Sequence, residues 1–368
     1  MQKISVKKIW ITRTLQTHLM EKNLLDKSYI LFECIKVVHG LVKSTLIDLN
    51  RKQYYEVSRE FAQTIIDYNG KKLGELCNAI EFDNEAIIGF LTENELIFFD
   101  DEIQTSHFPP ISLEFNELPL YHCEVDFEIV LNHPEFIQQM ESLGCKILNI
   151  YISENATFDQ SNEITLNLLN EILKQFDESS INFILLFIPR SAIHSIAASL
   201  DEVFLSFPRL HNLIVYNSDS DMVKNHQMIY TTHSLEELMQ GELDKSFITP
   251  SILLFVESQS YNPYYNRRIY INKERNIYAT YNSEIQYDTH AENLQSAITS
   301  SEYQNLITIT KDQISECKDC IYRYMCTDSR VPVLRGEEYL HETECSIYEG
   351  WFWVSFSIEQ EITWKPHS

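Results

Sequence analysis

The sequence predicts an α/β protein whose 368 residues form three folded parts behind an N-terminal extension, residues 1–28. Three observations carry this prediction. Residues 29–105 place a strand, a hairpin, three helices and a strand in that order, and residues 110–256 alternate apolar strands with helices. Residues 257–368 hold half of the 8 cysteines in one cluster. The length exceeds that of one ordinary core, which agrees with several domains.

Composition restricts the class of partner. Hydrophobic residues make up 44% and charged residues 23%, as in folded globular proteins. The formal net charge of -25 opposes binding to nucleic acid or to an anionic membrane, and favours a basic partner. No apolar run is long enough for a membrane span, and the basic start lacks an apolar signal core. We therefore expect a cytoplasmic protein with reduced cysteines.

The unit at 29–105 has the outline of a winged helix-turn-helix fold. Ser58 is a candidate N-cap for the first helix, and the residues before it alternate as in a hairpin strand. The expected elements are a strand at 29–38, a hairpin of 44–49 with 53–57, a helix behind Ser58, helices at 73–80 and 84–94, and a strand at 96–99. The absence of a basic stripe on the last helix argues against the alternative of a DNA reader.

A linker at 101–110 leads to the alternating region, which predicts a parallel sheet. Strands are expected at 111–115, 146–153, 182–189, 210–216 and 252–256, with helices at 133–143, 161–176, 191–207 and 234–243. About five strands are too few for a closed eight-stranded barrel, so an open or partial barrel fits better. The last part, 257–368, begins with a hairpin of 267–272 and 277–281, followed by helices at 291–300 and 301–308.

Four cysteines, Cys317, Cys320, Cys326 and Cys345, have the spacing of a metal site. The two-residue gap between the first two lets one turn direct both thiolates at one metal, and the later two close the site. Spacing alone leaves an iron-sulfur cluster and zinc nearly even. The other four cysteines are scattered in apolar or mixed segments and are expected to be small core residues.

Residues 266–352 resemble a SPASM domain, the C-terminal module of radical S-adenosylmethionine peptide-modifying enzymes. The matching stretches are Asn266-Arg-Arg-Ile-Tyr-Ile-Asn-Lys-Glu-Arg-Asn-Ile, Cys317-Lys-Asp-Cys-Ile-Tyr-Arg-Tyr-Met-Cys and Glu344-Cys-Ser-Ile-Tyr. The resemblance implies that the four cysteines hold the second of two auxiliary clusters, a [4Fe-4S] cluster, with zinc as the alternative. Ligands of the first cluster are missing, because Arg330 occupies one cysteine position and residues 277–281 contain no cysteine.

The radical motif is missing as well. No Cys-x3-Cys-x2-Cys exists anywhere in the chain, and the loop expected after the strand at 111–115 offers only Cys123. We therefore expect a degenerate, radical-SAM-like partial barrel that does not use S-adenosylmethionine. His122 and Cys123 do not form a catalytic pair, because neighbouring strand residues point to opposite faces.

From about Tyr29 onward the chain resembles the SPASM-domain peptide maturase of grasp-with-spasm systems. The similar stretches are Phe32-Glu-Cys-Ile-Lys-Val-Val-His-Gly, residues 44–55, Tyr322-Arg-Tyr-Met-Cys-Thr-Asp-Ser-Arg-Val-Pro and residues 344–351. The resemblance implies a partner ATP-grasp ligase and a ribosomally made precursor peptide.

The resemblance also gives the N-terminal unit a role, recognition of the precursor's leader peptide. The leader would add as a strand along Gln53, Tyr54, Tyr55, Glu56 and Val57. Three alternatives stay open: the ligase itself binds the leader and this unit docks the ligase, the chain is an enzyme that uses its single cluster for electron transfer or substrate binding, or it is a zinc-stapled adaptor without catalysis.

Overall fold

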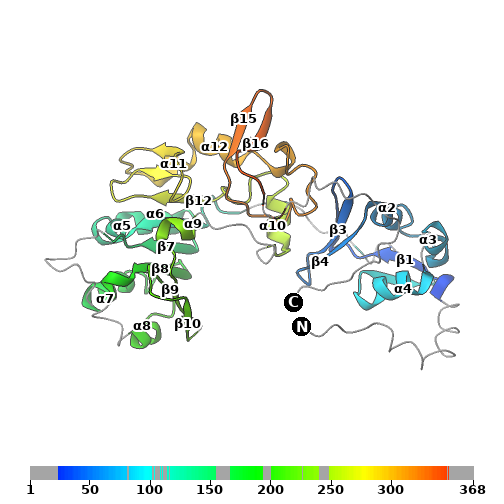
Figure 1. Ribbon diagram of the computed structural model, residues 1–368, viewed down its shortest axis with the longest axis horizontal. Helices are drawn as coiled ribbons and strands as arrows, with labels where there is room; N and C mark the ends of the chain where they lie inside the picture. Colours follow the sequence, from blue (N-terminus) through cyan, green and yellow to red (C-terminus); the bar gives the residue numbers. More distant parts are fainter. Residues whose placement is uncertain are drawn as a thin grey trace.

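The computed structural model describes residues 24–80, 83–101, 103, 108, 110, 114–115, 117–154, 166–193, 200–225, 227–239, 248–345 and 347. Most of the expected extension at 1–28 and of the strand at 111–115 lies outside these residues. Figure 1 shows three regions: the N-terminal unit at one end, a large sheet at the other, and the last described part of the chain, drawn in orange, between them.

The N-terminal unit contains two small sheets and three helices. Its strands are β1 (Ser28–Leu31), β2 (Ile35–His39), β3 (Lys43–Asp48), β4 (Gln53–Ser58) and β5 (Ile97–Asp100), and its helices are α2 (Arg59–Asp67), α3 (Leu73–Ala79) and α4 (Asn84–Glu93). Ser58 caps α2 as expected, accepting a hydrogen bond from the Phe61 amide at 3.1 Å. The helices bury their apolar faces in one core with β1, β2 and β3.

The single strand expected at 29–38 is wrong, because the chain changes sheets there. β1 pairs antiparallel with β5, whereas β2 pairs antiparallel with β3. Between them the Ile35 amide donates to the Phe32 carbonyl at 2.8 Å, which forms a turn. The continuous apolar pattern did not reveal this turn. β3 also pairs with β4, giving the order β2-β3-β4, in which β4 is the last of the described strands.

The central region and part of the C-terminal region share a nine-stranded sheet of order β10-β11-β9-β8-β7-β6-β12-β13-β14. Six of these strands, from β11 to β12, are parallel to one another. The strands are β6 (His122–Asp126), β7 (Ile147–Tyr151), β8 (Phe183–Pro189), β9 (Leu210–Tyr216), β10 (Met222–Lys224), β11 (Met228–Tyr230), β12 (Arg268–Ile271), β13 (Ile277–Tyr278) and β14 (Gln286–Asp288). The fold is therefore mixed α/β around a large, mostly parallel sheet, which in the described residues is open at β10 and β14.

The two faces of this sheet are covered differently. One face packs against apolar residues of α5 (Phe127–Asn132), α6 (Glu135–Ser142), α7 (Leu166–Lys174), α8 (Leu200–Ser206), α11 (Leu294–Ile298) and α12 (Ser301–Ile307). The other face carries an aromatic cluster that includes Tyr151, Phe187, Tyr216 and Tyr270, against α9 (Leu235–Met239). A short 3-10 helix, η3 (Arg190–Ala192), follows β8.

Two further expectations are corrected. The strand expected at 252–256 is the helix α10 (Ile252–Glu257), whose N-cap Ser251 accepts from the Leu254 amide at 3.1 Å. A five-residue apolar run does not by itself distinguish a strand from a buried helix. Cys123, expected in a loop, lies within β6 and is fully buried. β6 runs directly into α5, so the connection after it contains no cysteine.

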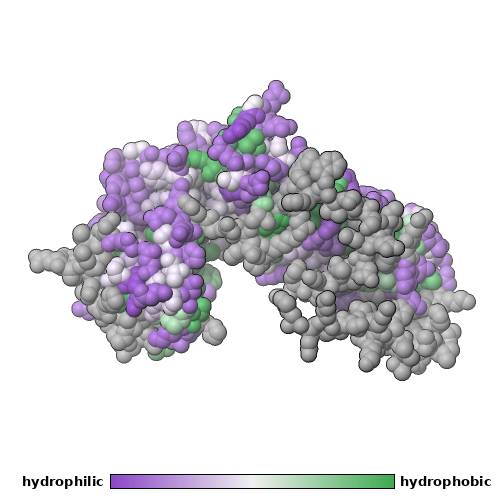
Figure 2. Space-filling model, viewed as in Figure 1, coloured by the Kyte–Doolittle hydropathy of each residue, from purple (hydrophilic) through white to green (hydrophobic). Residues whose placement is uncertain are grey.

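The C-terminal residues continue with η5 (Lys311–Gln313), the cysteine segment and an antiparallel hairpin of β15 (Pro332–Arg335) and β16 (Glu338–His341). Figure 2 shows a largely hydrophilic surface over the described residues of the visible face. Within the described part of the chain, no helix has both the length and the apolar character needed to cross a bilayer.

Candidate metal centre

The four clustered cysteines border a single cavity between η5 and the end of β16. Three of them lie in the cysteine loop, which we define as residues 317–326. This loop is a series of tight turns: the Cys317 amide donates to the Ile314 carbonyl and the Cys320 amide to the Cys317 carbonyl, both at 2.9 Å. Cys345 approaches the cavity from the irregular segment that follows β16. The structure thus brings the four predicted ligand residues to one place.

Burial keeps Cys317, Cys320 and Cys326 protonated in the absence of a metal. It raises the pKa of Cys317 and of Cys326 to about 12, and it also raises the pKa of Cys320. Because a metal binds the thiolate, metal binding at this cavity must release protons and will strengthen with rising pH. Four cysteines around one cavity are a donor set suited to zinc or to an iron-sulfur cluster.

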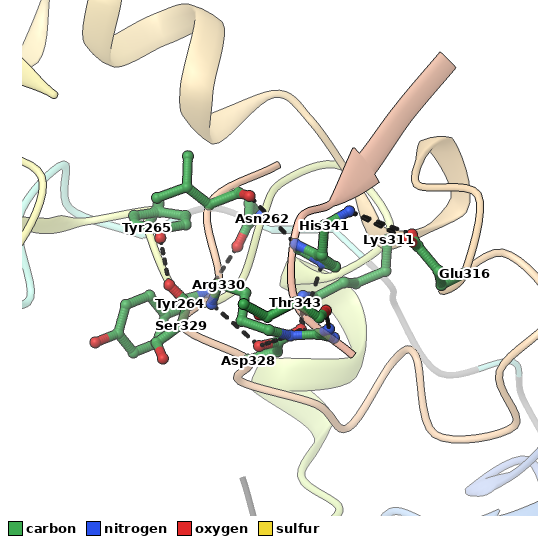
Figure 3. A network of polar contacts seen from close by, with 11 residues as sticks. Asn262, Tyr264, Tyr265, Lys311, Glu316, Asp328, Ser329, Arg330, His341 and Thr343 are labelled. Carbon is green, nitrogen blue, oxygen red and sulfur yellow. Dashed lines mark hydrogen bonds and ion pairs between the residues drawn. The ribbon is translucent and has the colours of Figure 1, made fainter. Parts of the chain in front are cut away.

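A buried polar network adjoins the cysteines (Figure 3). Asp328 is 2% exposed and accepts from the Lys311 ammonium at 3.2 Å and from the Arg330 Nη2 at 2.7 Å. Burial works to raise the pKa of Asp328, but the Arg330 hydrogen bonds and the Lys311 charge outweigh it, so that pKa lies well below its usual range. The carboxylate therefore stays ionised.

His341 completes this network from the end of β16. Its Nε2 lies 3.4 Å from an Asp328 oxygen but makes no hydrogen bond among the described residues. A ring nitrogen of His341, a carboxylate oxygen of Asp328 and the Cys317 sulfur all lie within 4.8 Å of one another. Sequence reasoning missed Lys311, Asp328 and His341, although each is close in sequence to a predicted ligand.

The cysteine loop also holds the N-terminal sheet, through contacts that we call the joint. Arg323 Nη1 donates to the His39 carbonyl at 2.8 Å, and the Leu41 amide donates to the Asp319 carbonyl at 3.2 Å. Apolar residues of β2, β3 and the cysteine loop pack together with Ile248, Phe255 and Ile347. The cysteine-loop residues of the joint, such as Asp319 and Arg323, lie between the predicted metal ligands, so the geometry of the cavity and the position of the sheet are mechanically linked.

The predicted peptide strand is β4, and its two faces have different neighbours. Tyr55 and Val57 pack against the N-terminal core, where the Tyr55 ring lies 5.6 Å from that of Phe90 on α4. Tyr54 stacks edge-on against Tyr322 with ring centroids 5.6 Å apart. Glu56 accepts a hydrogen bond from the Tyr322 hydroxyl. The alternation read from the sequence is therefore correct, but nothing in it indicated that the second face meets the cysteine loop.

Hydrogen bonds near the β2–β3 turn fix which residues of β4 point toward β3. The Gly40 amide donates to the Lys43 carbonyl at 2.8 Å, and the Leu49 amide donates to the Cys34 carbonyl at 3.0 Å. In an antiparallel pair, alternate residues exchange hydrogen bonds with the partner strand. These two bonds set which β3 residues face β2, and the remaining β3 residues face β4. By the β3–β4 register, the backbone N–H and C=O groups of Gln53, Tyr55 and Val57 point toward β3. Those of Tyr54 and Glu56 point away from it.

The remaining cysteines are distant from the cavity and behave as core residues. Cys123 and Cys145 are fully buried in the core of the large sheet, and Cys77 is buried in the N-terminal core. Cys34 is half-buried against the same N-terminal core.

Comparison with known proteins gives little guidance. No family model matches the sequence, and no curated protein matches it. Among solved structures, Streptococcus suis SuiB bound to S-adenosylmethionine overlaps at 10% identity and a TM-score of 0.28, covering 81% of this chain and 94% of that one. A second SuiB structure overlaps at 9% identity with the same TM-score and coverage. Overlap at this level defines neither the fold nor the function of this chain.

Proposed function

We propose that this protein is a peptide maturation factor that binds the leader of a ribosomally made precursor peptide along β4 and acts beside an ATP-grasp ligase. The observation that carries the proposal is the terminal position of β4 among the described strands, in the order β2-β3-β4. A terminal strand is the natural template for an added peptide strand, in which backbone hydrogen bonds give affinity and side-chain pockets give selectivity.

The surroundings of β4 support a peptide ligand. α4 lies against one face of the strand through Phe90, so an added strand would meet apolar side chains of that helix. The net charge of -25 favours a basic peptide over nucleic acid. Gln53, Tyr54, Tyr55, Glu56 and Val57 are the residues we assign to peptide binding.

We further propose that Cys317, Cys320, Cys326 and Cys345 hold a [4Fe-4S] cluster, with zinc as the alternative. Four thiolates complete the coordination of either centre, which suits a structural role. Such a centre would fix the cysteine loop and, through the joint, the position of β4. Anaerobic purification followed by counting of iron, sulfide and zinc distinguishes the two metals.

Leader binding is tested with proline substitutions on the two sides of β4. Glu56→Pro removes a backbone N–H that points away from β3, whereas Tyr55→Pro removes one that points toward it. Fluorescence anisotropy with a labelled precursor should show weaker binding for Glu56→Pro than for Glu56→Ala, which keeps that N–H while losing the same side-chain contacts. Tyr55→Pro should lower stability as well. Unchanged peptide affinity in the folded Glu56→Pro variant would refute binding at this edge.

Partnership with the ligase is tested by co-expression. The mass of the precursor is compared with the ligase alone, with this protein alone and with both. Modification that needs both supports the proposal, and equal modification by the ligase alone defeats it. A mass change with this protein alone favours the alternative, an enzyme that uses its cluster. If the metal count gives zinc and the ligase works unaided, the adaptor alternative stands.

Radical chemistry is tested directly. The chain has no Cys-x3-Cys-x2-Cys, the motif that binds the S-adenosylmethionine-cleaving cluster in the family it resembles. Incubation with S-adenosylmethionine and dithionite should therefore yield no 5′-deoxyadenosine by chromatography. Catalytic formation of that product would overturn the view of the sheet as a scaffold without radical activity.

A further inference from the structure

One buried and one partly buried cation share a single carboxylate beside the cysteine cavity (Figure 3). The Lys311 side chain is 0% exposed and that of Arg330 is 18% exposed, and both pair with Asp328. Arg330 also donates to the Thr343 carbonyl, which carries no full charge. Buried charges are costly unless they are balanced. The three groups leave one positive charge without a matching anion among the ion pairs of the described residues.

The lining of the cavity does not share the acidic character of the chain. Its charged side chains are the cations Lys311, Arg323 and Arg330 and the carboxylates Glu316 and Asp328, and Arg323 pairs with Asp312 outside the lining. Chance would favour a negative lining, because the chain has 54 acidic residues and only 29 Lys and Arg. Two cations that share the Asp328 carboxylate beside the cysteines call for an anion in the cavity. The groups available to supply it are the four cysteines.

Four thiolates around a zinc ion or a [4Fe-4S] centre in its oxidised state carry two net negative charges. We propose that Lys311 and Arg330 are the charge-compensating residues of such a centre, and that Asp328 holds them in place while reducing their effect. This inference rests on the proposed metal centre and extends it to the groups that set its affinity.

The direction of the electrostatic effects agrees. Burial raises the pKa of Cys317 and of Cys326, and the Lys311 charge acts against that rise at both residues. The alternative, a second cation bound by Cys317, Asp328 and His341, is disfavoured because Asp328 already accepts from two cations. A third positive charge at that carboxylate would meet repulsion from both.

Cobalt(II) titration of the full metal-free protein tests the proposal. Thiolate-to-cobalt absorbance reports occupancy, and competition with a chelator gives the affinity. Lys311→Met should weaken cobalt binding roughly 10- to 100-fold, the effect of losing an outer partner of a metal site. Asp328 keeps Arg330 as a partner in this variant. Lys318→Met is the matched control, an exposed lysine next to Cys317, and should leave affinity unchanged.

The sign of a second variant separates charge compensation from a merely structural role. Asp328→Asn removes the negative charge that offsets the two cations, so cobalt binding should tighten. If Lys311→Met and Asp328→Asn both weaken binding, or if Lys311→Met leaves it unchanged, the proposal is wrong.

Two substitutions of Arg330 test the proposal independently if either of these variants fails to fold. Arg330→Lys should keep most of the cobalt affinity and Arg330→Met should lose it, and equal affinities would refute the proposal. No peptide or ligase takes part in these titrations, so their outcome is separate from that of the leader-binding tests. Failure of the native protein to bind cobalt would defeat the metal centre itself and this inference with it.

Discussion

Replacing Gly40 by alanine should loosen the joint between the N-terminal sheet and the cysteine loop. A Cβ atom at Gly40 would lie 2.5 Å from Ile321 Cγ2 and 2.8 Å from the Asp319 carbonyl oxygen. The isoleucine side chain can shift, but the carbonyl belongs to the backbone and accepts from the Leu41 amide at 3.2 Å. An ordinary Cβ contact begins near 3.4 Å, so the two segments must separate by roughly 0.6 Å.

That separation weakens the Leu41–Asp319 hydrogen bond, since N–H···O bonds lose strength beyond about 3.2 Å. Overpacking of this kind costs about 1–3 kcal/mol. If this free energy destabilises the joint alone, the equilibrium ratio of molecules with the joint formed to molecules with it broken drops about 5- to 150-fold. Hydrogen exchange measured by mass spectrometry should therefore accelerate by that factor in residues 39–43 and 318–323. Exchange in the core of the large sheet should not change.

Gly89→Ala is the matched control. Gly89 lies inside α4, and a Cβ there meets nothing within 4 Å. Alanine at a helix-interior position stabilises by about 1 kcal/mol, so this variant should leave exchange at the joint as it is in the native protein. If Gly40→Ala exchanges no faster than Gly89→Ala in residues 39–43 and 318–323, the joint does not depend on this close approach and the reasoning fails.

Three further predictions concern the large sheet and the cysteines. Glu124→Gln leaves Arg268 buried without its carboxylate and should lower the free energy of unfolding in urea by about 3–5 kcal/mol; a loss near zero would show that the pair is not what ties β12 to β6. Burial raises the pKa of Asp126 from 3.8 to about 6, so between these pH values the folded chain retains a proton that the unfolded chain releases. The contribution of this group to stability therefore falls as pH rises from 3.8 to about 6. Asp126→Asn should flatten the decline in Tm between pH 4 and 6, and an unchanged pH profile would contradict it. Cys320→Ala should abolish metal retention measured by elemental analysis, whereas Cys34→Ala, outside the cavity, should keep it.

The sequence by itself determined the elements whose causes are local. Ser58 was identified as a helix cap because its side chain needs only the amide three residues later. The apolar run 182–189 predicted a buried strand, and β8 (Phe183–Pro189) lies in the middle of the parallel sheet. The alternation in residues 53–57 gave the two faces of β4 correctly.

Only the tertiary structure decided which distant segments meet. The turn between β1 and β2 exists because β1 pairs with β5 and β2 with β3, and a short apolar pattern is compatible with either partner. β12 lies beside β6 through pairs such as Ile269 with Cys123, a choice made by the fit of two remote strands. The unbalanced positive charge at Lys311 and Arg330 also results from the packing of remote segments. A charged residue in the sequence carries no sign of its burial, which depends on how remote segments pack around it.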